Sequence, residues 1–136
     1  MSHPEFKAKL TLEATVSPSE DPAKVAGAVA GVAGLGPDAV SVGGGSVRLA
    51  SEDPKALVRL RGQLRDRHVR SAARKLLLRD RTDRSASIML NRQAAAAGVV
   101  AVCGSPEESP LGPIYLTISS GELDAAIDWL TAYSEG

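Results

Sequence analysis

The sequence is poor in several features that would assign a chain to a particular class of protein. Among its 136 residues there is a single cysteine, Cys103, so no disulfide can form within the chain. The weakly polar run VAGAVAGVAGLG is well short of the roughly 20 apolar residues that span a bilayer. The first residues do not resemble a secretory leader. We therefore expect a single domain over residues 1–136, cytoplasmic and without a membrane span.

Residues for metal binding and covalent catalysis are also scarce. His3, His68 and Cys103 lie far apart and match no zinc spacing. We interpret Cys103 as a small buried hydrophobic residue, although His68 could approach it in the fold. Glu107 and Glu108 could transfer protons only inside a cleft, and their proline-rich surroundings favour solvent. Neither a Walker loop nor GxGxxG is present, so we expect no catalytic residue, metal or cofactor.

Aromatic residues are few: Phe6, Tyr115, Trp129 and Tyr133. Trp129 and Tyr133 fall in an acidic C-terminal helix, and no RNP motif is present. The sequence therefore gives no indication of an aromatic platform on which bases would stack.

Charge of both signs is plentiful, but it is unevenly distributed. The formal net charge is zero, yet residues 55–92 hold twelve cations and three acids, an excess of nine positive charges. Residues 93–136 hold six acids and neither lysine nor arginine. A strong local positive field is expected if the middle segment forms one face of the molecule.

The first half of the chain alternates strand and helix signals. Residues 7–16 have the two-residue period of a half-buried strand. Asp21 and Asp53 each precede a proline, which predicts N-caps for helices that begin at residues 22 and 54. The glycines at 43–45 separate two short apolar runs and predict a tight hairpin rather than a phosphate loop.

Between residues 55 and 80 the apolar face shifts, which predicts two packed helices or one kinked helix. One apolar face is formed by Leu57, Leu60 and Leu64, and the next by Val69, Ala72, Ala73 and Leu76. The change falls near residues 65–68. On the second helix, Arg67, Arg70 and Arg74 lie nearly opposite Val69 and Leu76, so we expect a basic stripe that faces away from the core.

The second half of the chain completes an α+β pattern. Strands are predicted at SIML, VVAV and IYLTI, with a short helical turn in NRQAAAAG. Ser119 and Glu122 form a capping box for a last helix, whose apolar stripe is Leu123, Ala126, Ile127 and Leu130. We expect a single α+β domain with a mainly antiparallel sheet and helices packed on one face.

The arginines carry the strongest functional signal. Arginine presents a flat fork of donors that matches phosphate oxygens. The sequence predicts a non-enzymatic protein that docks structured RNA through Arg61, Arg65, Arg67, Arg70, Arg74 and Lys75. The alternative is a solvated helix whose arginines pair with the acidic C-terminal segment. A protein-interaction module or homodimer, in which the basic middle of one subunit meets the acidic C-terminal region of another, is the rival function.

Asn91, Arg92 and Gln93 follow the SIML strand and could add hydrogen bonds to bases or ribose. An equal alternative is that Asn91 and Gln93 satisfy the local backbone. The SPLGP loop, residues 109–113, could instead line a pocket of an enzyme.

Three stretches together resemble a family of uncharacterised archaeal proteins: HVRSAARKLLL, LNRQAAAAG and EESPLGPI. Members of that family read roughly RILDAAR, INKQAAYAG and EESPLGPI in the same order. The resemblance spans most of the chain, up to the IYLTI strand. It implies an RNA-binding-like domain with a fold similar to the large-subunit ribosomal protein that carries 5S RNA.

The resemblance also transfers specific positions. It points to Asn91, Gln93, Ala94, Ala95 and Arg74, and to the loop residues Ser109, Pro110, Leu111, Gly112 and Pro113. Arg92 replaces the family's lysine, whereas Arg70 and Ser71 stand where the family has leucine and aspartate, so no role of that acid transfers. Some relatives are joined to a P-loop kinase-like domain, which implies a nucleotide-linked partner. A likeness of fold does not establish activity.

Overall fold

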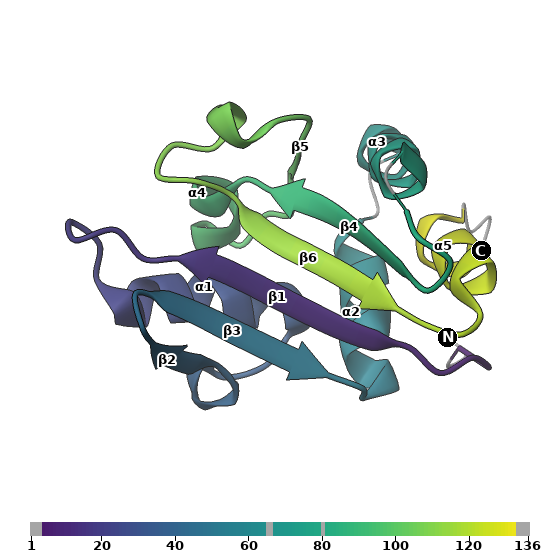
Figure 1. The fold of residues 1–136 in the computed structure, drawn as a ribbon, viewed down its shortest axis with the longest axis horizontal. Helices are drawn as coiled ribbons and strands as arrows, with labels where there is room; N and C mark the ends of the chain where they lie inside the picture. The colour runs from purple at the N-terminus through teal and green to yellow at the C-terminus, as the bar shows by residue number, and fades with distance from the viewer. Residues whose placement is uncertain (1–3, 65–66, 80, 133–136) are drawn as a thin grey trace.

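The fold is built on one antiparallel sheet of six strands (Figure 1). The structure, a computed structural model, describes residues 4–64, 67–79 and 81–132, without the side chain of Arg67. The strands are β1 (Lys9–Thr15), β2 (Ser41–Gly43), β3 (Ser46–Ser51), β4 (Ser85–Leu90), β5 (Val102–Cys103) and β6 (Ile114–Ser119). They lie in the order β2-β3-β1-β6-β4-β5, and neighbouring strands are antiparallel. The predicted single-domain α+β class is confirmed.

The helices are α1 (Pro22–Ala33), α2 (Pro54–Gln63), α3 (Arg67–Arg79), α4 (Arg92–Ala96) and α5 (Leu123–Thr131), with short 3-10 turns η1 (Pro37–Ala39) and η2 (Pro106–Glu108). The first two begin at the residues that the sequence predicts, 22 and 54. Asp21 accepts a hydrogen bond from the Ala23 N–H at 3.0 Å, and Asp53 accepts one from Lys55 at 2.9 Å. Each carboxylate thus satisfies one of the N–H groups left open at a helix start, and both predicted caps are confirmed.

The core lies between one face of the sheet and the helices behind it. In β1 the side chains of Leu10, Leu12 and Ala14 are buried, while those of Lys9 and Glu13 point to the other face and are exposed. Figure 1 shows α1 and α2 behind the strands, and the buried residues of both helices belong to the same apolar cluster as β1. Burial of this cluster on one side leaves the opposite face of the sheet open.

Helix α3 lies beside β4, at the edge of the sheet (Figure 1). β5 pairs only with Met89 and Leu90, so α3 covers the part of β4 that lacks a neighbouring strand on that side. The residues of α3 with no exposed surface are Ala73 and Leu77. The predicted apolar face was therefore rotated about the helix axis relative to the observed one. It included Leu76, which is only partly buried, and omitted Leu77, which is buried.

Two other sequence predictions were wrong in detail. The VVAV strand is reduced to a two-residue bridge, β5. The capping box at Ser119 and Glu122 does not form, because Ser119 is the last residue of β6. The neighbouring Ser120 caps the turn instead. Its hydroxyl accepts from the Glu122 N–H at 3.0 Å and donates to the carbonyl of Lys7 at 2.6 Å.

Candidate nucleic-acid interface

Two members of the basic stripe predicted on α3, Arg70 and Arg74, contact the C-terminal segment, and the side chain of the third, Arg67, lies outside the described parts of the chain. Arg61, Arg70 and Arg74 make contacts with the C-terminal segment, and the cause is the position of α5. This helix packs against α3 on the side that helical periodicity alone assigns to solvent. Arg70 is therefore only partly exposed, contrary to the predicted stripe, whereas Arg74 is exposed as predicted but pairs with α5.

Arg61 and Arg70 are held by an aromatic ring and by backbone carbonyls. The guanidinium carbon of Arg61 lies 5.1 Å from the centre of the Trp129 ring, within range of a cation–π interaction. Its Nε is buried and has no hydrogen-bond partner among the described residues. Arg70 donates to the carbonyl of Leu64, and to that of Ala132 at 3.1 Å. Both groups connect α2 and α3 to the end of α5.

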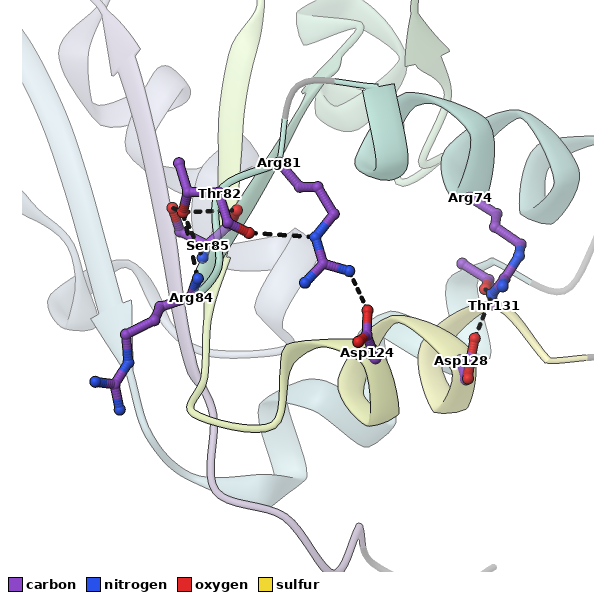
Figure 2. A network of polar contacts seen from close by, with 8 residues as sticks. All are labelled: Arg74, Arg81, Thr82, Arg84, Ser85, Asp124, Asp128 and Thr131. Atoms are coloured by element: carbon purple, nitrogen blue, oxygen red, sulfur yellow. Dashed lines mark hydrogen bonds and ion pairs between the residues drawn. The ribbon is translucent and has the colours of Figure 1, made fainter.

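Two ion pairs join the basic segment to the acidic helix α5 (Figure 2). Nη1 of Arg74 lies 2.7 Å from Oδ1 of Asp128 and 3.3 Å from Oγ1 of Thr131. Arg81, which follows α3, pairs with Asp124. The side chains of Asp128 and Asp124 are 65% and 82% exposed, so water screens both pairs. Opposite charges that lie in separate segments of the sequence thus neutralise each other in part within one chain.

Exposed cations remain on the outer side of α3. Lys75 and Arg79 are exposed and lie one helical turn apart, so they share a side of the helix. Arg84, also exposed, follows in the loop before β4, and Figure 2 shows it pointing away from α5. Arg65 and the side chain of Arg67 lie outside the described parts of the chain. Of the predicted RNA ligands in the described part of this segment, Lys75 and Arg74 are thus exposed, and Arg74 is paired with Asp128.

The junction after β4 starts a helix. Oδ1 of Asn91 accepts from the Ala94 N–H at 2.8 Å, which caps α4. Its amide nitrogen donates to the carbonyl of Glu108 at 3.3 Å. Gln93 is exposed, whereas Arg92 is buried. For Asn91 the structure supports the alternative interpretation, satisfaction of the local backbone.

Arg92 links this junction to the SPLGP loop. Only 5% of its side-chain surface is exposed, and its Nη1 lies 2.6 Å from Oε1 of Glu20. Its Nε donates to the carbonyl of Gly112 at 2.9 Å. The Ser109 hydroxyl accepts from the Arg92 N–H and donates to the same Gly112 carbonyl, each at 3.0 Å. The guanidinium group is therefore enclosed by the chain and does not lie on a binding surface.

Glu20 is the acid that compensates the buried guanidinium. Burial raises the pKa of its carboxyl, but the hydrogen bond from the Ser17 N–H and the bond and charge of Arg92 outweigh that effect. The pKa of Glu20 consequently lies below its ordinary value. At neutral pH the pair is ionised, so Arg92 has little charge to offer an anion from outside.

The SPLGP loop is a turn with a strained tip. Leu111 has a backbone φ of 69°, a left-handed conformation that costs energy for any residue with a β carbon. The residue is 53% exposed. Pro110 is exposed and Pro113 is buried, so only the tip of the loop, which begins at Pro110 and ends before Pro113, is in contact with solvent. Two of the three stretches that carry the family resemblance, LNRQAAAAG and EESPLGPI, thus contact each other through Arg92, Ser109 and Gly112.

The open face of the sheet was not recognised from the sequence. Strand register brings its outward side chains into rows that cross the sheet. Hydroxyl groups dominate these rows: Thr11, Thr15, Ser41, Ser46, Ser85, Ser87, Tyr115, Thr117 and Ser119. The longest row runs Ser41, Arg48, Glu13, Tyr115, Met89, Cys103. The alternating polar residues were visible in each strand, but their alignment depends on pairings between distant segments.

Cys103 ends this row and is buried at the sheet edge. Burial, and then the nearby Glu108 carboxylate, raise the pKa of its thiol, which disfavours the nucleophilic thiolate. Among the described residues, histidine, cysteine and acidic side chains form no cluster able to hold a metal ion. The same parts of the chain contain no helix with the length and apolar character that crossing a bilayer requires.

These features define an α+β domain with an open antiparallel sheet, and comparison with known proteins places it in a family. A UPF0201 protein of Sulfurisphaera tokodaii is 35% identical over 125 residues, which cover 90% of this chain and 86% of the relative. One from Metallosphaera sedula is 34% identical with the same coverage. The chain belongs to the UPF0201 family, an uncharacterised archaeal family. A scan against family models gave no match.

Solved structures of the same family share the fold. A crystal structure described as that of an uncharacterized UPF0201 protein superimposes with a TM-score of 0.75 at 21% sequence identity and covers 94% of this chain and 96% of its own. The UPF0201 protein of Methanococcus jannaschii, at the same identity and coverage, gives a TM-score of 0.70. The antiparallel α+β architecture is thus a property of these family members.

Proposed function

We propose that this protein is a non-enzymatic RNA-binding domain whose contact surface is the open face of the sheet together with the outer side of α3. The observation that carries the proposal is the composition of that face. Its rows consist largely of hydroxyl side chains, which hydrogen-bond phosphate and ribose oxygens. Arg70 and Arg74 are replaced as the proposed ligands, because the carbonyls of Leu64 and Ala132 and the carboxylate of Asp128 already bind them.

The charge on this face favours a polyanion. In the described strands, Glu13 is the one carboxylate in the rows, and Nε of Arg48 lies 3.2 Å from its Oε1. Lys9 is exposed at one end of the face, and Lys75 and Arg79 are exposed on α3 at its edge. RNA would therefore meet more positive than negative groups, and its affinity would fall as salt rises.

The family resemblance supports the same class of ligand. The RNA-binding-like label, and the expected likeness to the ribosomal protein that carries 5S RNA, belong to this proposal. A P-loop kinase-like partner remains an expectation from the resemblance. No cofactor is required, since hydroxyl, lysine and arginine groups bind phosphate directly.

Charge complementarity no longer argues for the rival function, a homodimer that joins a basic and an acidic surface. Arg74 and Arg81 already pair with Asp128 and Asp124 of the same chain. Self-association through another surface is an outcome that the experiment below can detect.

The test compares two charge reversals of equal size on opposite sides of the sheet. Lys9→Glu with Lys75→Glu alters the open face and its edge. Lys24→Glu with Lys55→Glu alters exposed positions on α1 and α2, behind the sheet. RNA affinity is measured by fluorescence anisotropy over a range of salt concentrations. We expect the first pair to weaken binding strongly and to flatten the salt dependence, and the second pair to change it little.

Each other result has a definite meaning. Equal losses for both pairs would show attraction by overall charge and would contradict a defined surface. Absence of RNA binding by the unaltered protein at low salt would reject the function. Light scattering on the same samples reports self-association, and a dimer without RNA affinity would establish the rival.

A further inference from the structure

We propose that Tyr115 is a stacking position for one base of a single-stranded RNA segment that crosses the open face of the sheet. This inference rests on the proposed function and makes it more specific. The sequence predicts binding of structured RNA by shape and phosphate contacts, whereas the position of Tyr115 adds a site for an unpaired base.

Tyr115 differs from the other described aromatic residues in its surroundings. Phe6 and Trp129 pack edge to face with 5.9 Å between ring centres, and Arg61 covers the Trp129 ring. Tyr115 is 45% exposed and lies in β6, near the middle of the sheet. Its direct neighbours in the row are Glu13 on β1 and Met89 on β4. A large ring is thus presented to solvent on a face that is largely polar, next to the thioether of Met89.

A shallow trough adjoins this ring where α3 meets the sheet. It has a volume of about 170 Å³, and its lining includes Tyr115, Met89 and Ser87 from the sheet and Leu76 and Arg79 from α3. Sites for drug-sized ligands usually measure about 300–1,000 Å³, so the trough suits one planar ring and not a whole folded ligand. Tyrosine and methionine offer soft, polarisable surfaces for such a ring.

Polar groups around the trough match the remaining parts of a nucleotide. Ser87 and Thr117 lie opposite each other in the row next to that of Tyr115, with 2.8 Å between Oγ of Ser87 and Oγ1 of Thr117. Both hydroxyls can exchange hydrogen bonds with a base edge or ribose. Arg79 and Lys75 place positive charge along the α3 side, where the phosphates of a strand would pass. The acid nearest to the β5 end, Glu108, is turned to the N–H groups of Gly104 and Ser105.

Whether the site binds single-stranded or duplex RNA depends on whether the faces of the bases are accessible. In a duplex each base is covered by its neighbours, so an exposed tyrosine on a flat sheet cannot reach a base face. An unpaired base can stack on the ring, and such stacking tolerates any base identity. We therefore expect preference for single strands with little preference for sequence.

The experiment measures the affinity of a short oligoribonucleotide that contains one 2-aminopurine, as a single strand and as a duplex. Variants are Tyr115→Ala, Tyr115→Phe and the control Val42→Ala, which removes an exposed apolar side chain from β2 on the other side of the sheet. Tyr115→Ala should weaken single-strand binding about tenfold and abolish the quenching of 2-aminopurine. Tyr115→Phe and Val42→Ala should retain both, and duplex affinity should be the same in all four proteins.

The outcomes separate this inference from the proposed function. If the unaltered protein binds RNA and Tyr115→Ala binds it equally well with undiminished quenching, the stacking site is rejected while RNA binding stands. If the unaltered protein binds neither strand nor duplex, the function itself is rejected. Circular dichroism checks that Tyr115→Ala is folded, which its exposed position leads us to expect. Self-association that Tyr115→Ala abolishes, in the absence of RNA affinity, would assign the ring to a contact between two copies.

Discussion

The arginine-rich helices α2 and α3 and the open face of the sheet differ in how well their amino-acid composition predicts the groups that they present to solvent. The helices hold eight of the sixteen lysines and arginines of the chain, yet Arg61, Arg70 and Arg74 contact Trp129, backbone carbonyls and Asp128. The sheet face has few charges, yet its hydroxyl groups and Tyr115 lie toward solvent. A dense run of charge in a sequence therefore predicts a binding surface only when the neighbours of each side chain are known.

The chemistry of arginine explains the difference. Guanidinium is weakly hydrated, flat and able to bind several acceptors at once, so it suits positions between packed helices. Serine and threonine carry no formal charge, and their branched or small side chains fit a strand whose outer face is wet. The comparison thus predicts that arginine substitutions will mainly change stability, and that substitutions on the sheet face will mainly change binding.

The largest effect is expected for Arg92→Ala. This change removes the partner of Glu20 and the side-chain hydrogen bond to the Gly112 carbonyl of the SPLGP loop, and it leaves a carboxylate in a largely buried site. Breaking a buried ion pair by removal of one partner costs about 3–5 kcal/mol. Urea denaturation followed by circular dichroism measures the free energy of unfolding. The control is Gln93→Ala, the exposed neighbour, for which a change within about 0.5 kcal/mol is expected. Similar small effects for both variants would show that Arg92 is not a structural residue.

The pH dependence of stability gives a second, smaller effect at the same pair. The folded-state pKa of Glu20 lies below its unfolded value, which for glutamate is about 4.3. The pair therefore contributes its full stability above that pH, and the contribution is lost as the pH falls through the lower folded-state pKa. Glu20→Gln should be less stable than the unaltered protein at neutral pH, and the gap should narrow in acid. Chemical denaturation at a series of pH values measures it, and a gap independent of pH would contradict the assignment.

Local signals predicted most of the fold. The aspartate and proline pairs at 21–22 and 53–54 fix helix starts through short-range hydrogen bonds and a preset backbone angle, so they need no distant partner. Alternation in residues 7–16 gave the buried face of β1 for the same reason. The capping box at Ser119 failed because the sheet extends β6 to that residue, a pairing with Lys9 that lies far away in the sequence.

The candidate site was harder to predict because it depends on neighbours that the sequence does not show. Helical periodicity placed Arg70 and Arg74 opposite the core, which would be correct for a helix with one packed side. Helix α3 has two packed sides, the sheet edge and α5. Likewise, Tyr115 was treated as one of a few scattered aromatics, and only strand register places it beside Met89 and near Ser87 and Thr117.

A modest effect is expected when both ion pairs between the basic segment and α5 are removed. Arg74→Gln with Arg81→Gln should lower the free energy of unfolding by about 0.2–1 kcal/mol per pair, since exposed pairs are weak, and added salt should reduce the difference. RNA affinity should change little. The matched control, Lys9→Gln with Lys75→Gln, removes the same formal charge and should weaken RNA binding without loss of stability. If the double arginine variant lost more RNA affinity than the double lysine variant, the result would support the original prediction that Arg74 binds RNA.

The smallest effect concerns the tip of the SPLGP loop and has the opposite sign. Leu111 adopts a φ of 69°, and its exposed side chain contributes little packing, so Leu111→Gly should relieve backbone strain. A left-handed conformation costs a residue with a β carbon about 1–2 kcal/mol, and the greater freedom of glycine in the unfolded chain offsets about 0.5–1 kcal/mol of that gain. A net stabilisation under about 1 kcal/mol is expected in urea denaturation. Leu111→Ala keeps the strain and should give no gain, and an equal result for glycine and alanine would mean that the side chain, and not the backbone, determines the energy of this loop.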